Sequence, residues 1–397
     1  MATGIICEYN PFHKGHLYHI QTTLARTANA PIICVMSGHY VQRAEPALFD
    51  KWTRTRMALA AGASLVLELP TYYSTATAEW FAFGALSLLH STGLIQTISF
   101  GIENPSELPA LQAAASHLQP ESPQYRRLLR SFLAEGAGFA HARSAALEKL
   151  TLQPLSLEAP NTILVLEYLR ALKKLHWHPA LLPLHRVSAG YHDPSLEAAC
   201  PSATALRRLA AKGTDISPYL PDCCRSALPA SSVFPADLFS ALSYRLCFHT
   251  PDTLREIDEV AEGLENRILA AARHYPDYEA LLSLLKTKRY PTSRLRRILL
   301  NILLDIKRSE KAALRFEEGP AYIRVLGFRR DQQALLSQLT SSASLPVVTN
   351  LAKQLPQLPP RAKAMLQNEI QFSHVYATSP PRLSRDCEYR MPLVILD

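Results

Sequence analysis

Short apolar runs alternate with longer stretches of helical pattern over the first hundred residues. A buried strand needs only a few apolar residues, whereas a helix shows apolar positions three and four residues apart. The short runs predict four strands, at 4–8, 31–36, 64–69 and 94–100. The stretches between them predict three helices, at 15–28, 50–61 and 78–90, the second with Asp50 as its N-cap. This alternation predicts an α/β fold of the Rossmann-like kind, in which helices cover both faces of a parallel sheet.

The pattern changes along the rest of the chain. Residues about 105–160 are predicted to form a helical insertion, and a fifth strand is predicted at 181–186. From about residue 217 helical patterns dominate, at 235–249, 253–273, 278–285 and 292–306, and strand-like pieces follow at 322–328 and 393–396. A chain of 397 residues fits two domains, which we place at 1–215, with the insertion, and at 216–397, mainly α-helical.

Composition limits the class of protein. Hydrophobic residues make up 48% of the chain and charged residues 19%, which is typical of a globular protein. The formal net charge of +8 permits a nucleic-acid partner without requiring one. The seven cysteines form no CxxC pair and their number is odd, which favours reduced thiols in the cytoplasm. The first residues do not resemble a signal peptide, and no stretch of about 18 apolar residues predicts a membrane span.

The segment EYNPFHKGH leads from the first strand into the first helix and carries the clearest chemistry. Backbone N–H groups at a helix start attract phosphate, and Gly15 would let a nucleotide lie close to the backbone. His13 and His16 are three residues apart, which places both imidazoles on one helix face. There they could donate hydrogen bonds to the α-phosphate of ATP and to the departing pyrophosphate, so we predict both as catalytic. His19, one turn further on, fits packing as well as binding.

A second helix start supports the first. The sequence PSATALR contains Ser202 as a predicted N-cap, and Arg207 lies one turn into the helix. HxGH nucleotidylyl-transferases have a similar Ser/Thr-rich helix start that ends in Arg or Lys. That similarity implies that Arg207 binds the β- and γ-phosphates, for which its planar fork of donors is suited.

Other candidate residues lie near the predicted strand ends, where α/β sheets bind ligands. Gly101 follows the fourth strand, Arg186 ends the fifth, and Asn161 precedes an apolar helix. Asn161 is equally well interpreted as an N-cap. The chain has no paired carboxylates with metal-ligand spacing, so we expect no resident metal and expect Mg²⁺ to arrive with ATP.

The densest basic run lies at 286–297. Such a run can hold the phosphates of a nucleic acid, and Tyr290 within it could stack on a base. A solvated helix face is an equally good interpretation. Taken as a nucleic-acid-binding surface, which the family resemblance given next implies would bind tRNA, the run comprises Lys286, Lys288, Arg289, Arg294, Arg296 and Arg297.

Together these motifs resemble the bacterial tRNA(Met) cytidine acetate ligase family. The resemblance rests on blocks spread over most of the chain: GIICEYNPFHKGHLYH, MSGHYVQRAEPALFDKWTR, ELP, AEWFAFGALSLL, FGIE, PN, HRVSAGYHD, PSATALR, SRLRRILLNILLDI and YIRVLGF. It implies that residues 1–215 activate acetate with ATP to acetyl-adenylate. The acetyl group would then pass to N4 of the wobble cytidine of elongator tRNA(Met), held by residues 216–397. Three positions depart from the family pattern: Lys14 replaces the usual Asn, Ala44 the usual Gly, and Ile102 a small polar residue.

The resemblance also implies the nucleotide contacts, which fall in one continuous segment and at later strand ends. The segment comprises Ile6, Cys7, Glu8, Tyr9, Asn10, Pro11, Phe12, His13, Lys14, Gly15, His16, Leu17, Tyr18 and His19. The later residues are Gly101, Asn161, Arg186 and Val187, and the second helix start adds Ser202 and Thr204.

Three other interpretations stay open. A nucleotidyltransferase that makes a nucleotide cofactor from ATP and a phosphorylated small molecule shares the HxGH motif, although such enzymes are usually far shorter. An aminoacyl-tRNA synthetase-like protein is disfavoured because the chain has no KMSKS-like loop. A non-catalytic RNA-binding protein is disfavoured because both histidines, Gly15 and Arg207 are present. The acetate pocket does not follow from the sequence, and a homodimer is one oligomeric state that it leaves open.

Overall fold

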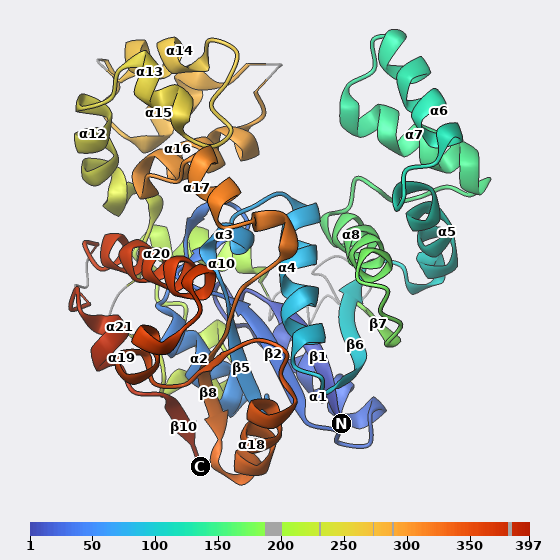
Figure 1. Ribbon diagram of the computed structural model, residues 1–397, viewed down its shortest axis with the longest axis vertical. Coiled ribbons are helices and arrows are strands. Elements are labelled where there is room, and N and C mark those ends of the chain that lie inside the picture. Colours follow the sequence, from blue (N-terminus) through green and yellow to red (C-terminus); the bar gives the residue numbers. More distant parts are fainter. Residues whose placement is uncertain (187–200, 230–231, 273, 288–289, 380–382) are drawn as a thin grey trace.

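The computed structural model describes residues 1–186, 201–229, 232–272, 274–287, 290–379 and 383–397. Its centre is a mostly parallel sheet with the strand order β10-β8-β5-β2-β1-β6-β7, and β9 pairs with β8 beside that path (Figure 1). All the predicted strands belong to it. The bounds are β1 Ala2–Cys7, β2 Ile32–Ser37, β5 Leu65–Leu69, β6 Ile95–Ile102, β7 Ala180–His185, β8 Ile323–Arg329, β9 Val347–Val348 and β10 Val394–Leu396.

Apolar side chains pack on both faces of this sheet. Within β2, Ile33 and Val35 belong to the core on one face, and Cys34 and Met36 belong to the core on the other. A strand that is buried on both faces must be apolar throughout, which explains why the sequence shows short continuous apolar runs rather than alternation. The predicted fold class, a parallel α/β sheet covered by helices, is confirmed.

Helices cover the two faces as the strand pattern requires. One face holds α1 (Lys14–Arg26), α2 (Lys51–Ala60) and α10 (Ala203–Ala211), and the other holds α4 (Ala78–Ser91) and α8 (Pro160–Lys174). Two predicted N-caps are confirmed, because Asp50 accepts a hydrogen bond from the backbone N–H of Thr53 and Ser202 accepts one from Ala205. These local signals fix where α2 and α10 begin.

The closing strands return to the first sheet. β8 runs antiparallel to β5, with Leu67 opposite Val325, and β10 runs parallel to β8, with Val394 opposite Gly327. A Cβ at Gly327 would lie 2.6 Å from the carbonyl oxygen of Val394, so glycine permits the close approach of β10. The domain boundary at 215/216 stays a prediction, and the return of these strands is a finding that the sequence pattern did not indicate. The helices of this part are α18 Gln333–Ser342, α19 Leu351–Gln354, α20 Pro360–Tyr376 and α21 Cys387–Arg390.

A group of short helices stands above the sheet in Figure 1, and we call α12 to α17 the helical unit. The helix predicted at 253–273 is wrong as a single element. It is divided because Glu259, Glu262 and Gly263 all have positive φ, which no helix accommodates. The bounds are α12 Phe239–Cys247, α13 Pro251–Glu256, α14 Leu264–Ala271, α15 Tyr278–Leu285, α16 Thr292–Leu304 and α17 Arg308–Ala313.

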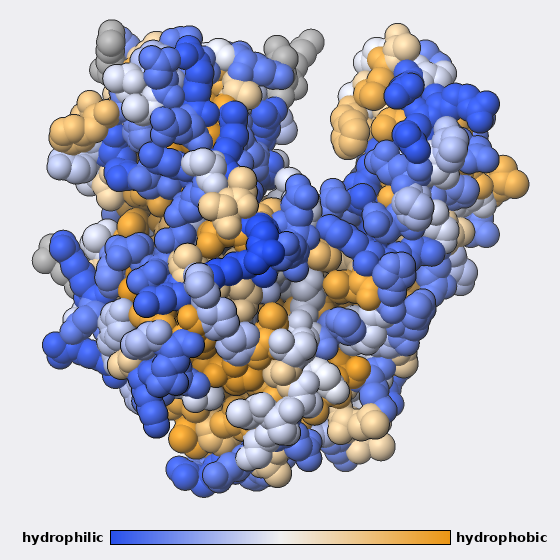
Figure 2. All heavy atoms as spheres, viewed as in Figure 1, coloured by the Kyte–Doolittle hydropathy of each residue, from blue (hydrophilic) through white to orange (hydrophobic). Residues whose placement is uncertain are grey.

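The predicted insertion contains three helices that project from the sheet, and we call them the helical arm. They are α5 (Leu108–Leu118), α6 (Pro123–Ala134) and α7 (Phe139–Thr151). Figure 2 shows the arm and the helical unit as two lobes with largely hydrophilic surfaces, separated by a notch on the face in view. Among the described residues, none of the helices is long and apolar enough to cross a bilayer.

Short elements complete the architecture. A hairpin of β3 (Tyr40–Val41) and β4 (Glu45–Pro46) follows β2. The remaining short helices are α3 Thr71–Ser74, α11 Asp222–Arg225, η1 Pro105–Glu107, η2 Ser217–Tyr219, η3 Pro235–Leu238, η4 Phe316–Glu318, η5 Arg330–Gln332 and η6 Leu355–Gln357.

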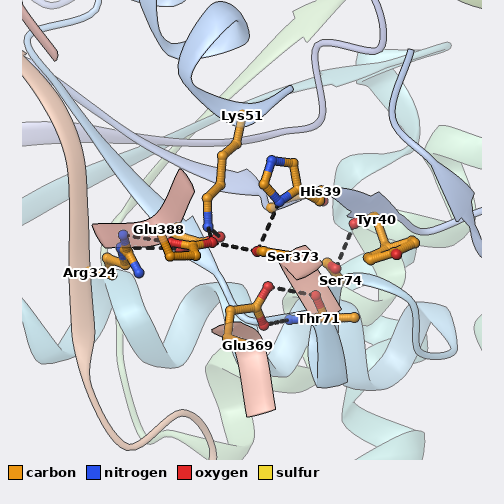
Figure 3. Close-up of polar contacts among 12 residues, drawn as sticks. His39, Tyr40, Lys51, Thr71, Ser74, Arg324, Glu369, Ser373 and Glu388 are labelled. Carbon is orange, nitrogen blue, oxygen red and sulfur yellow. Dashed lines mark hydrogen bonds and ion pairs between the residues drawn. The ribbon is translucent and has the colours of Figure 1, made fainter. Parts of the chain in front are cut away.

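Buried charges join the closing segment to the first half of the chain, and we call them the ionic network (Figure 3). Lys51 Nζ lies 2.5 Å from Glu68 Oε1 and 2.6 Å from Glu388 Oε1, and Arg324 Nη2 lies 2.7 Å from Glu388 Oε2. Glu369 accepts hydrogen bonds from the backbone and the hydroxyl of Thr71, each at 2.7 Å. The charges of Lys51, Arg324 and the two glutamates that they contact are tolerated at this depth because they are paired, and the network with Glu369 fixes α20 and α21 against β5 and α2.

Candidate active site at the start of the first helix

The first helix begins with an unusual cap made of two imidazoles. His13 is the N-cap residue, and its Nδ1 accepts a hydrogen bond from the backbone N–H of Gly15 at 3.1 Å. His16 Nδ1 accepts one in return from the backbone N–H of His13 at 3.2 Å. This is a capping box in which both capping groups are histidine rings. The helix start therefore holds the two rings in fixed positions.

The hydrogen bonds assign the tautomer of each ring. The two rings are stacked with their centroids 3.7 Å apart and their planes at 17°. Because each Nδ1 acts as an acceptor, a neutral ring carries its proton on Nε2. His13 Nε2 is buried and has no hydrogen-bond partner among the described residues. A buried donor without a partner is costly, and here it lies at a helix start that attracts anions.

The surroundings keep these rings neutral. Burial, together with the positive charge of Arg186, lowers the pKa of His13 to about 4. Burial lowers the pKa of His16 well below its ordinary value, and the neighbouring His13 and Arg186 act in the same direction. At neutral pH both imidazoles are therefore uncharged N–H donors.

At Gly15 a side chain would clash with the protein, whereas at Gly101 it would not. A Cβ at Gly15 would lie 2.9 Å from Cε1 of His13, so a side chain there would displace the capping ring. A Cβ at Gly101 would meet only the Cβ of Arg186, at 4.0 Å, so protein packing does not require glycine at that position. Gly101 leaves open space at the end of β6, next to Arg186.

A polar chain links the carboxyl ends of β6 and β7 to the start of α8. Glu103 accepts hydrogen bonds from Nδ2 of Asn161 at 2.6 Å and from the backbone and hydroxyl of Thr162 at 3.0 Å. Arg186 Nη1 donates to Asn161 Oδ1 at 2.5 Å. Burial acts to raise the pKa of Glu103, but the hydrogen bonds outweigh it and lower that pKa, so Glu103 is ionised. These hydrogen bonds, from Glu103 through Asn161 to Arg186, hold the guanidinium of Arg186 at the carboxyl ends of β6 and β7.

Arg207 reaches the same region from α10. Its Nη1 donates to the carbonyl oxygen of Asn10 at 2.7 Å, and its Nε lies 3.3 Å from Glu45 Oε1. The backbone of Asn10 belongs to the loop that opens α1, and the side chain of Asn10 accepts a hydrogen bond from Leu48 at 2.7 Å. Three predicted elements of the site, the imidazole pair, Arg186 and Arg207, are thus gathered around one helix start.

Comparison with known proteins agrees with this geometry. The family described as HIGH Nucleotidyl Transferase matches residues 1–389. A protein of Thermoanaerobacter sp. (strain X514) called tRNA(Met) cytidine acetate ligase is 40% identical, over 89% of this chain and 90% of that one. A protein of the same name from Clostridium perfringens is 33% identical over 99% of both chains. The chain belongs to the tRNA(Met) cytidine acetate ligase family.

Solved structures of this family have the same fold. The crystal structure of apo Thermotoga maritima TmcAL matches with a TM-score of 0.91, at 30% identity over 100% of both chains. A second crystal form of that protein, bound with alpha-thio ATP, matches with a TM-score of 0.90 over the same coverage. The family resemblance predicted from the sequence is confirmed.

Several residues of the segment that resembles the family's nucleotide site serve packing here. Tyr9 and Phe12 are buried in the core beneath α1, and the hydroxyl of Tyr9 lies 3.7 Å from Cys34 Sγ. His19 Nε2 lies 2.9 Å from Ser99 Oγ, which also contacts Thr23 at 2.7 Å. Through this packing and these contacts, the three side chains hold the segment in place against the sheet and α1. Val187 lies outside the described residues.

The arginines of the predicted tRNA-binding surface that the structure describes form contacts within the protein. Arg297 pairs with Glu259 through two contacts, at 2.8 and 3.0 Å. Arg296 pairs with Glu45 at 3.2 Å, and Arg294 lies over the ring of Tyr290. Tyr290 is buried, which does not favour the interpretation that its ring stacks on a base. Lys286 is exposed, and Lys288 and Arg289 lie outside the described residues.

The sequence interpretation missed Glu103 and Glu45 as residues of the site. Glu103 follows Gly101 at a strand end, a position that could have indicated it. Glu45 gave no such signal, because its two arginine partners lie far along the chain. Ala44 has a φ of 55°, a left-handed conformation that glycine adopts at no steric cost, which fits the expectation of a glycine at this position in the family.

Proposed function

We propose that this protein activates acetate with ATP and acetylates N4 of the wobble cytidine of elongator tRNA(Met). The observation that carries the proposal is the imidazole pair, with its Nε2 protons free of the cap, at the start of α1. The name of the relatives that match nearly the whole chain, tRNA(Met) cytidine acetate ligase, indicates acetate as the acyl donor and a cytidine of tRNA(Met) as the acceptor. A tRNA substrate fits a cytoplasmic location, and we propose that location for the protein.

In the first step, an acetate oxygen forms a bond to the α-phosphorus of ATP. The bond from that phosphorus to its bridging oxygen breaks, and pyrophosphate leaves with the electron pair. Negative charge grows on the phosphate oxygens as this happens, and N–H donors fixed in place beforehand stabilise it most effectively. His13 and His16 are such donors, since the cap holds their rings and burial keeps them neutral.

The other predicted residues would hold the nucleotide around this pair. The space at Gly101 admits a close ligand, and Asn161 and Arg186 line the adjacent strand ends. Ser202 and Thr204 lie at the start of α10, from which Arg207 would contact the departing phosphates. Mg²⁺ prefers phosphate oxygens and water, and we propose that it arrives with ATP.

In the second step, the N4 amine of cytidine attacks the acetyl carbonyl, AMP leaves, and the amine loses one proton. This step requires the tRNA to be held close to the adenylate. Lys286 and the partly exposed Arg294, Arg296 and Arg297 supply positive charge on the helical unit. The arm and the helical unit flank the notch seen in Figure 2, and we propose this side of the molecule for the tRNA.

A reaction with defined components tests the proposal. The full-length protein is incubated with ATP, Mg²⁺, labelled acetate and total tRNA, and the tRNA is then digested and its nucleosides are separated. We expect label in N4-acetylcytidine, with stoichiometric AMP and pyrophosphate, and none when ATP is omitted. Absence of labelled nucleoside, combined with transfer of AMP to a phosphorylated metabolite, would instead identify a cofactor-making nucleotidyltransferase.

A further inference from the structure

Glu45 lies between two arginines that come from distant parts of the chain. Its Oε1 is 3.3 Å from Nε of Arg207, and its Oε2 is 3.2 Å from Nη1 of Arg296. Arg207 belongs to α10, beside the imidazole pair, and Arg296 belongs to α16 of the helical unit. One carboxylate therefore contacts both the proposed ATP site and the proposed tRNA-binding unit.

The pairing with Arg207 is shielded from water. The side chain of Glu45 is 9% exposed and that of Arg207 is 17% exposed. Burial lowers the pKa of Arg207, and the charge of Glu45 is the strongest influence that opposes this shift. Arg207 Nη1 donates to the carbonyl of Asn10, and Glu45 Oε1, which has no hydrogen-bond partner among the described residues, lies 3.3 Å from Arg207 Nε as an ion pair, so the guanidinium is held at the opening of α1 from two sides.

The hairpin holds Glu45 in a fixed position. Glu45 pairs with Val41 across β3 and β4, and the turn between them is closed by a hydrogen bond from the backbone N–H of Ala44 to the carbonyl of Val41 at 2.8 Å. The residues on either side, Ala44 and Pro46, line an apolar crevice with side chains of the helical unit, among them Leu242 and Leu299. The carboxylate is thus anchored on both sides before any ligand binds.

We propose that Glu45 is a positioning residue that orients Arg207 toward the phosphates of ATP. Because Glu45 also pairs with Arg296, it connects the orientation of Arg207 to the helical unit. The inference rests on the proposed function only in assigning ATP as the ligand of Arg207. Glu45 itself does not contact the nucleotide in this account, and as an anion near the phosphates it would repel them.

A double-mutant cycle tests the inference. The dissociation constant of Mg·ATP is measured by equilibrium dialysis, without acetate or tRNA, for the wild-type protein, Glu45→Gln, Arg207→Ala and the double variant. We expect Glu45→Gln to weaken ATP binding about tenfold when Arg207 is present, the size typical of coupled contacting residues. In the Arg207→Ala background the same change should leave binding unchanged or strengthen it, because only the repulsion is removed.

Equal weakening in both backgrounds, or no weakening beside Arg207, would overturn the inference. Glu265→Gln is the matched control, since Glu265 is also a buried carboxylate paired with an arginine, Arg255, at 2.9 Å within the helical unit. It should not change ATP affinity. Thermal unfolding checks each variant, and Glu45→Asp, with a smaller expected loss, replaces Glu45→Gln if the latter does not fold.

The proposed function is assayed separately, by acetate-dependent exchange of pyrophosphate into ATP. Wild-type protein that binds ATP but shows no exchange with acetate would contradict the proposed function alone. Exchange by the wild type, together with an additive cycle in ATP binding, would contradict the role of Glu45 alone.

Discussion

Two groups of buried polar side chains differ in how far the protein itself completes them. In the ionic network, Lys51 contacts Glu68 and Glu388, and Arg324 contacts Glu388, so each charge meets an opposite charge although single atoms such as Arg324 Nη1 make no hydrogen bond among the described residues. At the start of α1, the imidazole pair is also buried, yet the cap uses only the Nδ1 atoms. The Nε2 donor of His13 is left without a partner among the described residues.

The difference separates polar groups that hold the fold from polar groups prepared for a ligand. Removing one member of a network of matched buried charges leaves its partners uncompensated, so the change should appear as lost stability. A fixed donor without a partner costs stability in the absence of ligand and lowers the energy of a charged transition state. Variants of the ionic network should therefore lose stability, whereas variants of the imidazole pair should lose catalytic activity.

Lys51→Met should have the largest effect, on stability. It leaves two buried carboxylates with less than their full pairing, which we expect to lower the free energy of unfolding by about 3–5 kcal/mol. Urea denaturation measures the loss. Lys307→Met, in an exposed pair with Glu256 at 3.1 Å, is the control and should cost less than about 1 kcal/mol. Equal losses in the two variants would contradict the role of the network.

His13→Asn and His16→Gln should have the next largest effect, on catalysis. Asn is a good N-cap and Gln suits the third helical position, so both keep the helix start while removing an imidazole donor. We expect pyrophosphate exchange to fall about 100- to 1000-fold, or about 2.7–4 kcal/mol of barrier, the typical loss for one such donor. Thermal unfolding should change little. A variant that loses stability but keeps exchange would place the imidazoles with the ionic network instead.

Glu369→Gln should change how stability depends on pH. Burial and the nearby charge of Glu68 raise the pKa of Glu369 from its ordinary value of 4.5 to about 7. The folded state then binds a proton that the unfolded chain has lost, so this contribution to stability falls as pH rises from about 4.5 to about 7. Glutamine cannot ionise, and we expect the variant to gain about 1–3 kcal/mol relative to the wild type between pH 5 and pH 8. Parallel stability curves would show that Glu369 is ionised throughout.

Arg297→Ala and Lys286→Ala should have the smallest effects, on tRNA binding. They compare a cation that the protein already pairs with one that it leaves exposed. Arg297 is paired with Glu259, whereas Lys286 is exposed. A cation that contacts phosphate contributes about one unit to the slope of log affinity against log salt concentration. We expect Lys286→Ala to lower the slope by about one and Arg297→Ala by less. Filter binding over a salt series measures both, and a larger change for Arg297 would mean that tRNA breaks its internal pair.

The sequence predicted well what depends on local chemistry. The caps at Asp50 and Ser202 and the strand runs were found because neighbouring residues determine them. The arginines of α16 show the limit, since charge is visible in sequence but their partners Glu259 and Glu45 are not. The break after Glu256 was missed because positive φ at Glu259 leaves no composition signal. Long-range pairing, like that of β8 with β5, has no local cause to detect.

The antiparallel neighbour of β5 has a consequence for synthesis. Residues 65–69 leave the ribosome long before residues 323–329, so the edge of β5 that β8 later occupies stays open while most of the chain is made. An unpaired apolar strand edge is a template for wrong pairing between chains. Nascent chains stalled before residue 323 should therefore depend on chaperones more than the finished protein does.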